Sequence, residues 1–430
     1  MSDKVDQQEE LEQLRNELRL EKQKSAQLED ECDALASEIL RLQEELKSKS
    51  YGQRESEISS VPVMETLEVF IEGDGNYTKK KFCQIQNACE GKNVICVAFL
   101  KSATAIGEES TYVLCGGVDS NLNCYQCIGG EKLFTIKLSS PLLALDVKDY
   151  LIACSMMDGT VAVVKFDPMK SLINQEKEEY LQLIKDHSKY VISVQWSPCG
   201  QYLATASHDK SVNIYCKRDG EVFVEKVKTI HFSSTPECLT FRCSQPGILS
   251  GSVDNMPPLP PSTSLSCCCE LIVGLRDSAH LVCVDCISFN ERRLCLNEQE
   301  FDTHVSFTPL MLSLQPAGDL LLIATDKNMH VVMNMLTLKR VRILASHASG
   351  QYGKPSVCWD LTGKYVYSNS EEESVVYVYS VASGKVVHRL SGEHTAIVRG
   401  VATSTAILNY GEVVNVLATA SYDKSVILWT

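Results

Sequence analysis

Two patterns of hydrophobic positions divide this chain of 430 residues. In residues 10–49 apolar side chains recur every seven residues, a spacing that predicts an α-helical coiled coil. After residue 65, short apolar runs of strand length are separated by polar turns, which predicts antiparallel β-strands. Residues 1–9 and 50–65 show neither pattern, so we expect a disordered N-terminus and a linker there.

The heptad pattern in residues 10–49 favours a parallel homodimer. Nine of the eleven a and d positions are apolar, and among them we expect the dimerisation contacts to come from Leu11, Leu14, Leu18, Leu28, Leu35, Ile39, Leu42 and Leu46. In a parallel pair the flanking g and e positions also bring opposite charges together, as in Glu10 with Arg15. The alternative is an amphipathic helix that docks on a helix of another protein.

Two segments in the second part of the chain follow the same sequence plan. Residues 187–215 and residues 417–429 share the string Leu-Ala-Thr-Ala-Ser-x-Asp-Lys-Ser-Val, which an apolar residue and an aromatic residue soon follow. Each segment therefore predicts a strand, a tight turn at the Asp and another strand. Internal repeats of this kind indicate an architecture built from several similar β-units.

These segments resemble WD40 repeats. The resemblance rests on a His before the first strand, a Thr in the second, an Asp in the next turn and an aromatic residue that ends the third: His187, Thr205, Asp209 and Tyr215, and again His394, Thr419, Asp423 and Trp429. It implies that each set forms a buried hydrogen-bond network within a four-stranded blade. Catalysis or metal binding by the His and Asp is the less favoured alternative, because their spacing is that of the repeat.

The spacing of the turn Asp along the chain identifies seven units. The further turn positions are Asp119, Asp158, Asp277, Asp326 and Glu372. The widest gap between turns contains a Pro/Ser/Cys-rich insertion at residues 243–269. We therefore expect an all-β, seven-bladed WD40-like propeller over residues 66–430, preceded by the α-helical coiled coil. Residues 77–87 or 66–72 would close the ring as the strand beside Val426–Trp429.

Charge and composition narrow the function. The formal net charge is −14, and the chain lacks the basic footprint of a nucleic-acid binder. No run approaches the roughly 18 apolar residues of a membrane-spanning helix, so we expect no membrane insertion. The first residues show no secretory signal, and the 19 cysteines are scattered through apolar runs. We therefore expect reduced, mostly buried cysteines and a cytoplasmic protein; nuclear, centrosomal and ciliary sites stay open.

Motifs for cofactor or metal chemistry are missing from the sequence. It contains neither a phosphate-binding GxxxxGK[ST] loop nor an HExxH zinc motif. The pairs Cys124/Cys127 and Cys283/Cys286 fall near the ends of expected strands, where residues three apart face opposite sides. A shared zinc ion is therefore not expected, nor any cofactor. Cys267–Cys269, beside the insertion, would be either exposed and oxidisable or packed within a strand.

The resemblance implies a non-enzymatic scaffold or adaptor that binds proteins or peptide segments, made bivalent by the coiled coil. Propellers of this family bind partners on the face that carries the turn Asp. We expect there Met157, Tyr190, His208, Arg276, Glu371, Ile397 and Tyr422, with Val118 and Thr325 at equivalent places. The alternatives are a substrate-recruiting adaptor of a ubiquitin ligase and, more remotely, an enzyme that uses the propeller channel.

Overall fold

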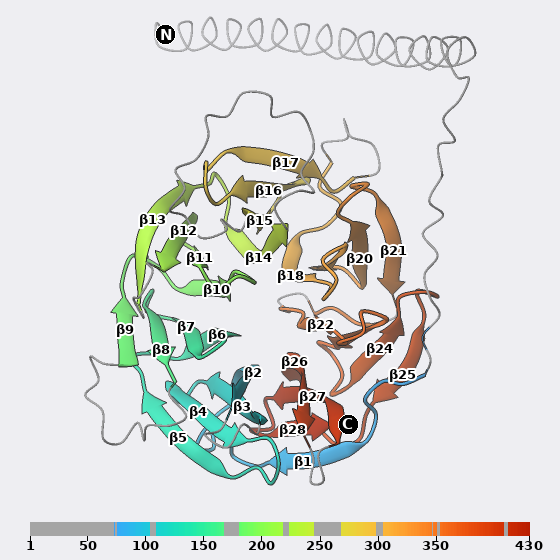
Figure 1. Ribbon diagram of the computed structural model, residues 1–430. Coiled ribbons are helices and arrows are strands. Elements are labelled where there is room, and N and C mark those ends of the chain that lie inside the picture. Colours follow the sequence, from blue (N-terminus) through green and yellow to red (C-terminus); the bar gives the residue numbers. More distant parts are fainter. Residues whose placement is uncertain are drawn as a thin grey trace, which may run out of the picture. The chain divides into compact units, whose positions relative to one another are not determined.

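A computed structural model describes residues 73 and 75–430, except 104–108, 167–179, 218–222, 245–267, 298–303, 346, 351–352 and 408–411. The described residues form 28 β-strands in seven four-stranded antiparallel sheets, without a helical element among them. Figure 1 shows these sheets as the blades of a ring, with successive blades in chain order. The expected all-β propeller with seven blades is therefore confirmed.

The first four blades take consecutive strands of the chain. Blade 1 comprises β2 (Val94–Ala103), β3 (Glu109–Gly117), β4 (Asn121–Gln126) and β5 (Lys132–Lys137). Blade 2 comprises β6 (Leu142–Lys148), β7 (Leu151–Met156), β8 (Val161–Lys165) and β9 (Leu181–Ile184). Blade 3 comprises β10 (Val191–Trp196), β11 (Tyr202–Ser207), β12 (Ser211–Lys217) and β13 (Val224–His231). Blade 4 comprises β14 (Pro236–Ser244), β15 (Cys268–Leu275), β16 (His280–Asp285) and β17 (Glu291–Cys295).

The last three blades include the one that closes the ring. Blade 5 comprises β18 (Pro309–Leu314), β19 (Leu320–Thr325), β20 (Met329–Asn334) and β21 (Arg340–Ala345). Blade 6 comprises β22 (Val357–Trp359), β23 (Tyr365–Asn369), β24 (Val376–Ser380) and β25 (Val386–Leu390). Blade 7 comprises β26 (Val398–Ile407), β27 (Val413–Ser421), β28 (Val426–Trp429) and β1 (Lys81–Ile85).

The hydrophobic core is divided among the contacts between neighbouring blades. Every residue of β7 and β19 is buried, whereas the outer strands β5 and β13 are largely exposed. Seven apolar clusters fill the seven interfaces; the one between blades 2 and 3 joins Ala153 and Val163 to Trp196, Leu203 and Tyr215. Because a middle strand packs on both of its faces, its sequence is a nearly continuous apolar run.

Blade 7 is assembled from both ends of the propeller sequence. β1 pairs with β28 in antiparallel register, with Lys81 opposite Trp429 and Ile85 opposite Val426. The amide of Thr430 donates to the Lys80 carbonyl, and the amides of Lys79 and Lys80 donate to the Thr430 carbonyl. Of the two segments expected to close the ring, residues 77–87 therefore contain the closing strand. The other candidate, residues 66–72, lies outside the described residues, as does the expected coiled coil over residues 10–49.

One expectation about the cysteines needs correction. Most of the described ones are indeed free thiols in the blade cores, but Cys243 and Cys269 form a disulfide. The two residues stand directly opposite each other on β14 and β15, at the edge of the insertion. The pairing depends on the register of two strands, which the sequence alone does not give.

Candidate functional site

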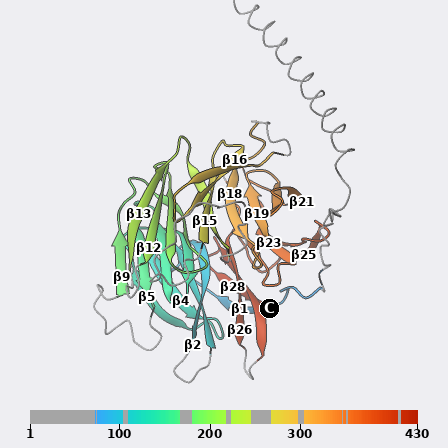
Figure 2. The ribbon, with the colours of Figure 1, turned by 45° about the horizontal axis from the view of Figure 1, so that its top comes forward.

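One backbone hydrogen bond recurs around the ring and marks equivalent positions in the blades. In six blades the residue after the second strand donates its amide to the carbonyl just before the first strand; in blade 6, Glu371 donates to Ala348. The seven donors are Val118, Met157, His208, Arg276, Asp326, Glu371 and Tyr422. Since strands run from one face of the ring to the other (Figure 2), these positions share one face, which we call the turn face.

Exposed side chains on the turn face are large and partly braced by neighbours. The Met157 side chain is 59% exposed and Tyr422 is 37% exposed. Tyr190 stacks on His208 with ring centroids 4.8 Å apart, and the Arg399 guanidinium lies 5.6 Å from the centre of the Tyr422 ring. Aromatic rings held in place by stacking lose little freedom on binding, which suits them to protein interfaces.

Two further expected residues also lie on the turn face. Exposed Arg276 donates from Nε to the Glu237 carboxylate at 2.6 Å, an ion pair that holds its side chain. Ile397 is half-buried, and its carbonyl accepts the hydrogen bond from the Tyr422 amide. The turn face is thus lined by basic, aromatic and apolar groups from blades 2, 3, 4 and 7.

Glu371 and Thr325 do not expose their side chains on the turn face. Glu371 is 7% exposed, because its carboxylate turns inward to accept a hydrogen bond from the Gly350 amide at 2.8 Å. It packs on Gly353, where a Cβ atom would overlap the carboxylate. Thr325 is fully buried because blade 5 is shifted by one residue, and half-buried Asp326 takes the equivalent position in its place.

Blade 3 contains the hydrogen-bond network that the sequence indicated. His187 Nδ1 donates to the Asp209 carboxylate at 3.0 Å, and His187 Nε2 lies 2.7 Å from the Thr205 hydroxyl. A carboxylate only accepts, so the neutral ring carries its proton on Nδ1 and accepts from Thr205 on Nε2. Tyr215 lies in the same blade, but its hydroxyl donates to Asp186 at 3.2 Å.

The electrostatics of this network favour a neutral His beside a charged Asp. Burial lowers the pKa of His187, and the Asp209 charge offsets only part of that effect. For Asp209 burial alone would raise the pKa, but hydrogen bonds from Ser211, the Ser188 amide and His187 outweigh it and lower the pKa. The network therefore fixes the turn between β11 and β12 and presents His208, the residue before Asp209, on the turn face.

Blade 7 repeats this arrangement with an indole in place of the phenol. His394 Nδ1 donates to Asp423 at 2.8 Å, and His394 Nε2 lies 2.8 Å from the Thr419 hydroxyl. Trp429 Nε1 donates to the same hydroxyl at 2.9 Å. The network holds the turn that presents Tyr422 on the turn face.

Blades 5 and 6 share a histidine pair that the sequence analysis missed. His347 Nδ1 lies 3.1 Å from the Tyr379 hydroxyl, and the His347 ring stacks on His330 of blade 5 with centroids 3.8 Å apart. His330 Nε2 lies 2.7 Å from the hydroxyl of Ser368, which occupies the position of Thr205. A wider search upstream of Glu372 would have found His347, since His394 also lies further from its Asp than His187 does.

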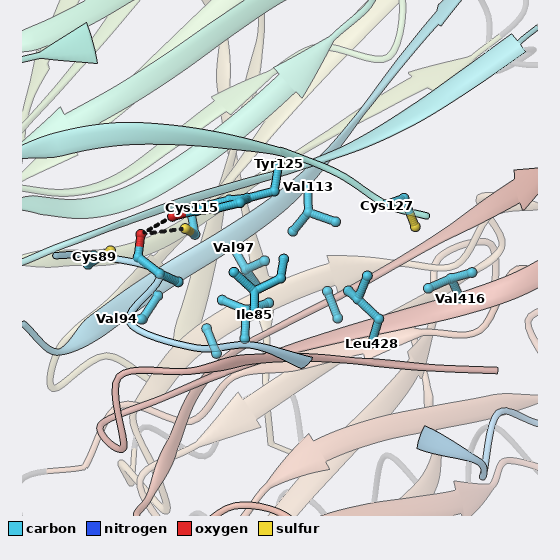
Figure 3. Close-up of a cluster of buried hydrophobic side chains, with 14 of the residues drawn as sticks. Ile85, Cys89, Val94, Val97, Val113, Cys115, Tyr125, Cys127, Val416 and Leu428 are labelled. Atoms are coloured by element: carbon cyan, nitrogen blue, oxygen red, sulfur yellow. Dashed lines mark hydrogen bonds between the residues drawn. The ribbon is translucent and has the colours of Figure 1, made fainter. Parts of the chain in front are cut away.

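Blade 1 replaces the network with cysteines. Cys115 occupies the Thr205 position, and its thiol and the Tyr125 hydroxyl both donate to the Ala88 carbonyl, at 3.8 and 2.8 Å (Figure 3). The Asn123 amide reaches the turn carboxylate of Asp119 at 3.0 Å. The turn is therefore held by Asn123 rather than by a histidine.

A cavity of about 800 Å³ occupies the axis of the ring. It is lined by the first strand of every blade, from β2 to β26. From the segment before β22, Lys354 reaches across to donate to the Ile192 carbonyl of β10 at 2.8 Å, and burial lowers the pKa of its ammonium group. Near the turn face, Arg399 lines the cavity and lies 3.9 Å from the Glu371 carboxylate.

Titratable groups elsewhere in the cavity support the packing of the blades. Burial raises the pKa of Asp146 to about 7, and its carboxylate accepts from the Trp196 amide at 2.6 Å, which joins blade 2 to blade 3. Burial likewise raises the pKa of the Cys96 and Cys238 thiols, which are therefore protonated at neutral pH. The lining thus offers fixed polar groups and neutral thiols rather than an activated cysteine nucleophile.

The two Cys-x-x-Cys pairs point their members into different cores. Cys124 belongs to the cluster between blades 1 and 2, whereas Cys127 belongs to the one between blades 7 and 1. Cys283 and Cys286 are separated in the same way across blade 4. Neither pair can therefore hold one ion between its two sulfurs.

The dimerisation positions from Leu11 to Leu46 lie outside the described residues. In the part of the chain that the structure describes, none of the elements is a helix long and apolar enough to cross a membrane.

Comparison with known proteins places part of the chain in a described family. Residues 178–216, which include most of blade 3, match the family described as "WD domain, G-beta repeat". The chain is also similar to the transcriptional corepressor LEUNIG_HOMOLOG of Arabidopsis thaliana, with 26% identity over 244 residues. That stretch covers 56% of this chain and 26% of the relative, so the chain matches about a quarter of the relative's length.

Proposed function

Since this chain is a WD40-repeat propeller protein, we propose that it is a scaffold that binds protein segments on its turn face and dimerises through residues 10–49. The observation that carries the proposal is the set of braced side chains on that face, which are half-buried or exposed. Tyr190 lies on His208, and Tyr422 lies beside Arg399. Rigid strand ends hold all of them, so a partner would order few groups on binding.

The turn face has the chemistry of a peptide-binding surface. Its aromatic and apolar groups can cover a partner's side chains, while Arg276 and Arg399 offer hydrogen bonds and positive charge. A chain segment laid across this surface would meet residues from several blades at once. The corepressor activity in the relative's name fits a protein that assembles complexes, and it supports a scaffold here.

Dimerisation would double the number of turn faces in one particle. A second face held by a short linker acts at an effective concentration of about millimolar, which strengthens binding to dimeric or repeated targets. We expect residues 1–430 to sediment as a dimer, and the Leu28/Leu35/Leu42→Asp variant to sediment as a monomer with the same circular dichroism of the propeller. Dimeric sedimentation of the variant would refute the coiled-coil interface.

The turn face is tested by affinity purification and mass spectrometry with the full chain as bait. We expect the Tyr190/Arg276/Tyr422→Ala variant to lose the specific partners by about tenfold or more. A matched control, Tyr150/Gln201/Leu361→Ala, removes three side chains from turns on the opposite face and should keep them. Equal recovery by both variants would show that binding occurs elsewhere.

The same experiment separates the two alternatives. Recovery of cullin-ligase subunits by the monomeric Leu→Asp variant would favour a substrate-recruiting adaptor of a ubiquitin ligase. WD40 propellers are generally non-enzymatic, and turnover that survives loss of both dimer and turn face would favour an enzyme. We place the scaffold in the cytoplasm because of its many buried thiols, and fractionation of cells that express the tagged chain tests this location.

A further inference from the structure

Three cysteines from neighbouring blades meet on the face opposite the turn face. Cys199 lies in the turn between β10 and β11, while Cys243 and Cys269 face each other across β14 and β15. The three Sγ atoms all lie within 4.8 Å of one another. Cys243 and Cys269 form the disulfide, and Cys199 Sγ lies 3.3 Å from Cys269 Sγ. Neither ring closure nor the turn face accounts for this three-cysteine cluster.

The cluster differs from the thiols of the blade cores. Cys124 and Cys154 are completely buried, and burial raises the pKa of both. Cys199 and Cys243 are half-buried, so dissolved reagents reach them, and only Cys269 is covered, with 1% of its surface exposed. Among the residues that the structure describes, this is the one group of three metal-ligating side chains gathered so closely.

The shape of the cluster distinguishes two kinds of sulfur chemistry. If Cys199 attacked the disulfide at Cys269, the attacking and leaving sulfurs would lie on opposite sides of Cys269 Sγ, more than about 5 Å apart. The Cys199 and Cys243 sulfurs lie within 4.8 Å of each other, so the three atoms form a compact triangle. A triangle suits chelation, because zinc–sulfur bonds of about 2.3 Å place neighbouring sulfurs about 3.8 Å apart.

We propose that the reduced three-cysteine cluster binds one Zn²⁺ ion. Two molecules of a small thiol, RSH, would first reduce the disulfide, giving RSSR and the Cys243 and Cys269 thiols. The ion then binds Cys199, Cys243 and Cys269 as thiolates, their three protons pass to solvent, and water takes the fourth position. Oxidation by RSSR removes two electrons, restores the Cys243–Cys269 bond and releases the ion; three protons from solvent then convert the two RS⁻ to RSH and the Cys199 thiolate to its thiol.

Metal binding would change which parts of the propeller are joined. The disulfide links β14 to β15 within blade 4. The ion would also link both strands to the β10–β11 turn of blade 3, beside the insertion at residues 243–269. The redox state of the cluster would thereby control the contact between two blades, independently of the turn face.

The test measures zinc bound to the full chain. The chain is reduced with a phosphine, supplied with Zn²⁺ and desalted, and zinc per chain is measured by mass spectrometry. We expect the wild type to retain one more tightly bound zinc equivalent than any of the single variants Cys199→Ser, Cys243→Ser and Cys269→Ser. Each variant should bind zinc about 100-fold or more weakly than the wild type does. The control Cys83→Ser removes a half-buried thiol of β1 and should bind as the wild type does.

Oxidation provides the second measurement. Treatment of the zinc-loaded chain with oxidised glutathione should release that equivalent and form the Cys243–Cys269 disulfide, which peptide mapping detects. The Cys199→Ser variant can still form the disulfide, so its folding is verified by its thermal midpoint when oxidised. Equal zinc in the wild type and this folded variant would overturn the proposal, as would zinc that stays bound after the disulfide forms.

Discussion

Blades 3 and 6 share one strand order but hold their second turns in different ways. In blade 3 the turn residue Asp209 accepts from His187, the Ser188 amide and Ser211. In blade 6 the corresponding residue, Glu372, is exposed, and His347 stacks on His330 of blade 5, with no carboxylate among the hydrogen-bond partners that the described residues give the two rings. The same fold therefore tolerates either a charge-assisted network or a neutral one.

The difference shows what the turn carboxylate contributes. A buried histidine is stable only when neutral unless a negative charge faces it. Asp209 partly compensates for burial of His187, whereas burial lowers the pKa of His347 to about 4 and holds the pKa of His330 well below its usual value. The stability of blade 3 should therefore depend on its acidic residue, and the stability of blade 6 should depend on the pH.

The largest expected difference in unfolding free energy is between two variants, each of which lacks one of the two turn carboxylates. Asp209→Ala strands several buried donors and should lower the free energy of unfolding by about 3–5 kcal/mol. Glu372→Ala removes an exposed side chain and should change it by about 0.5 kcal/mol or less. Urea unfolding followed by fluorescence measures both values. Similar losses in the two variants would contradict the comparison.

Acid should weaken blade 6 more than blade 3. A histidine whose folded pKa lies below its unfolded value of 6.5 binds fewer protons in the native state, so stability falls as the pH drops through that window. For His347, with a folded pKa of about 4, the loss approaches about 3 kcal/mol between pH 6.5 and 4.

Hydrogen exchange between pH 7 and 5 should therefore show β24 opening before β12. The His347→Gln variant cannot titrate at this site, and its unfolding free energy should fall less steeply over the same range. His187→Gln serves as the matched control in blade 3 and should flatten the profile less. A steeper dependence on His187 would reverse the assignment.

The smallest effect concerns the aromatic residues that end the third strands. Tyr379→Phe leaves buried His347 Nδ1 without its hydroxyl partner and should cost about 1–2 kcal/mol. Tyr215→Phe frees Asp186, which is exposed and regains water, so the loss should stay within about 0.5 kcal/mol. Thermal unfolding of the two variants measures both losses. A larger drop in the thermal midpoint for Tyr215→Phe than for Tyr379→Phe would contradict this prediction.

The propeller could be predicted because its repeats keep one local rule. The turn after the second strand needs a residue that accepts hydrogen bonds from nearby amides, and Asp does this in most units. Counting such turns therefore found seven blades. The sequence did not predict the one-residue shift in blade 5, because the shift depends on strand register. Thr325, rather than the residue before it, pairs with Pro309.

The turn face could be predicted by position but not by side-chain direction. Tyr190, His208, Arg276 and Tyr422 follow the repeat and are accessible. Glu371 has an equivalent backbone position, yet the glycines at 350 and 353 leave room for its carboxylate to turn inward. The segment before β22 creates that room about 20 residues upstream of Glu371, and the pattern around the turn does not indicate it.

The closing strand has a consequence for synthesis of the protein. β1 leaves the ribosome well before its partner β28, which is translated nearly 350 positions later. At roughly 5–20 residues per second, β1 waits tens of seconds with an unpaired edge. An unpaired edge strand can join strands of other chains. Yield in cells should therefore depend on how well chaperones cover the unpaired edge of β1 until β28 has been synthesised.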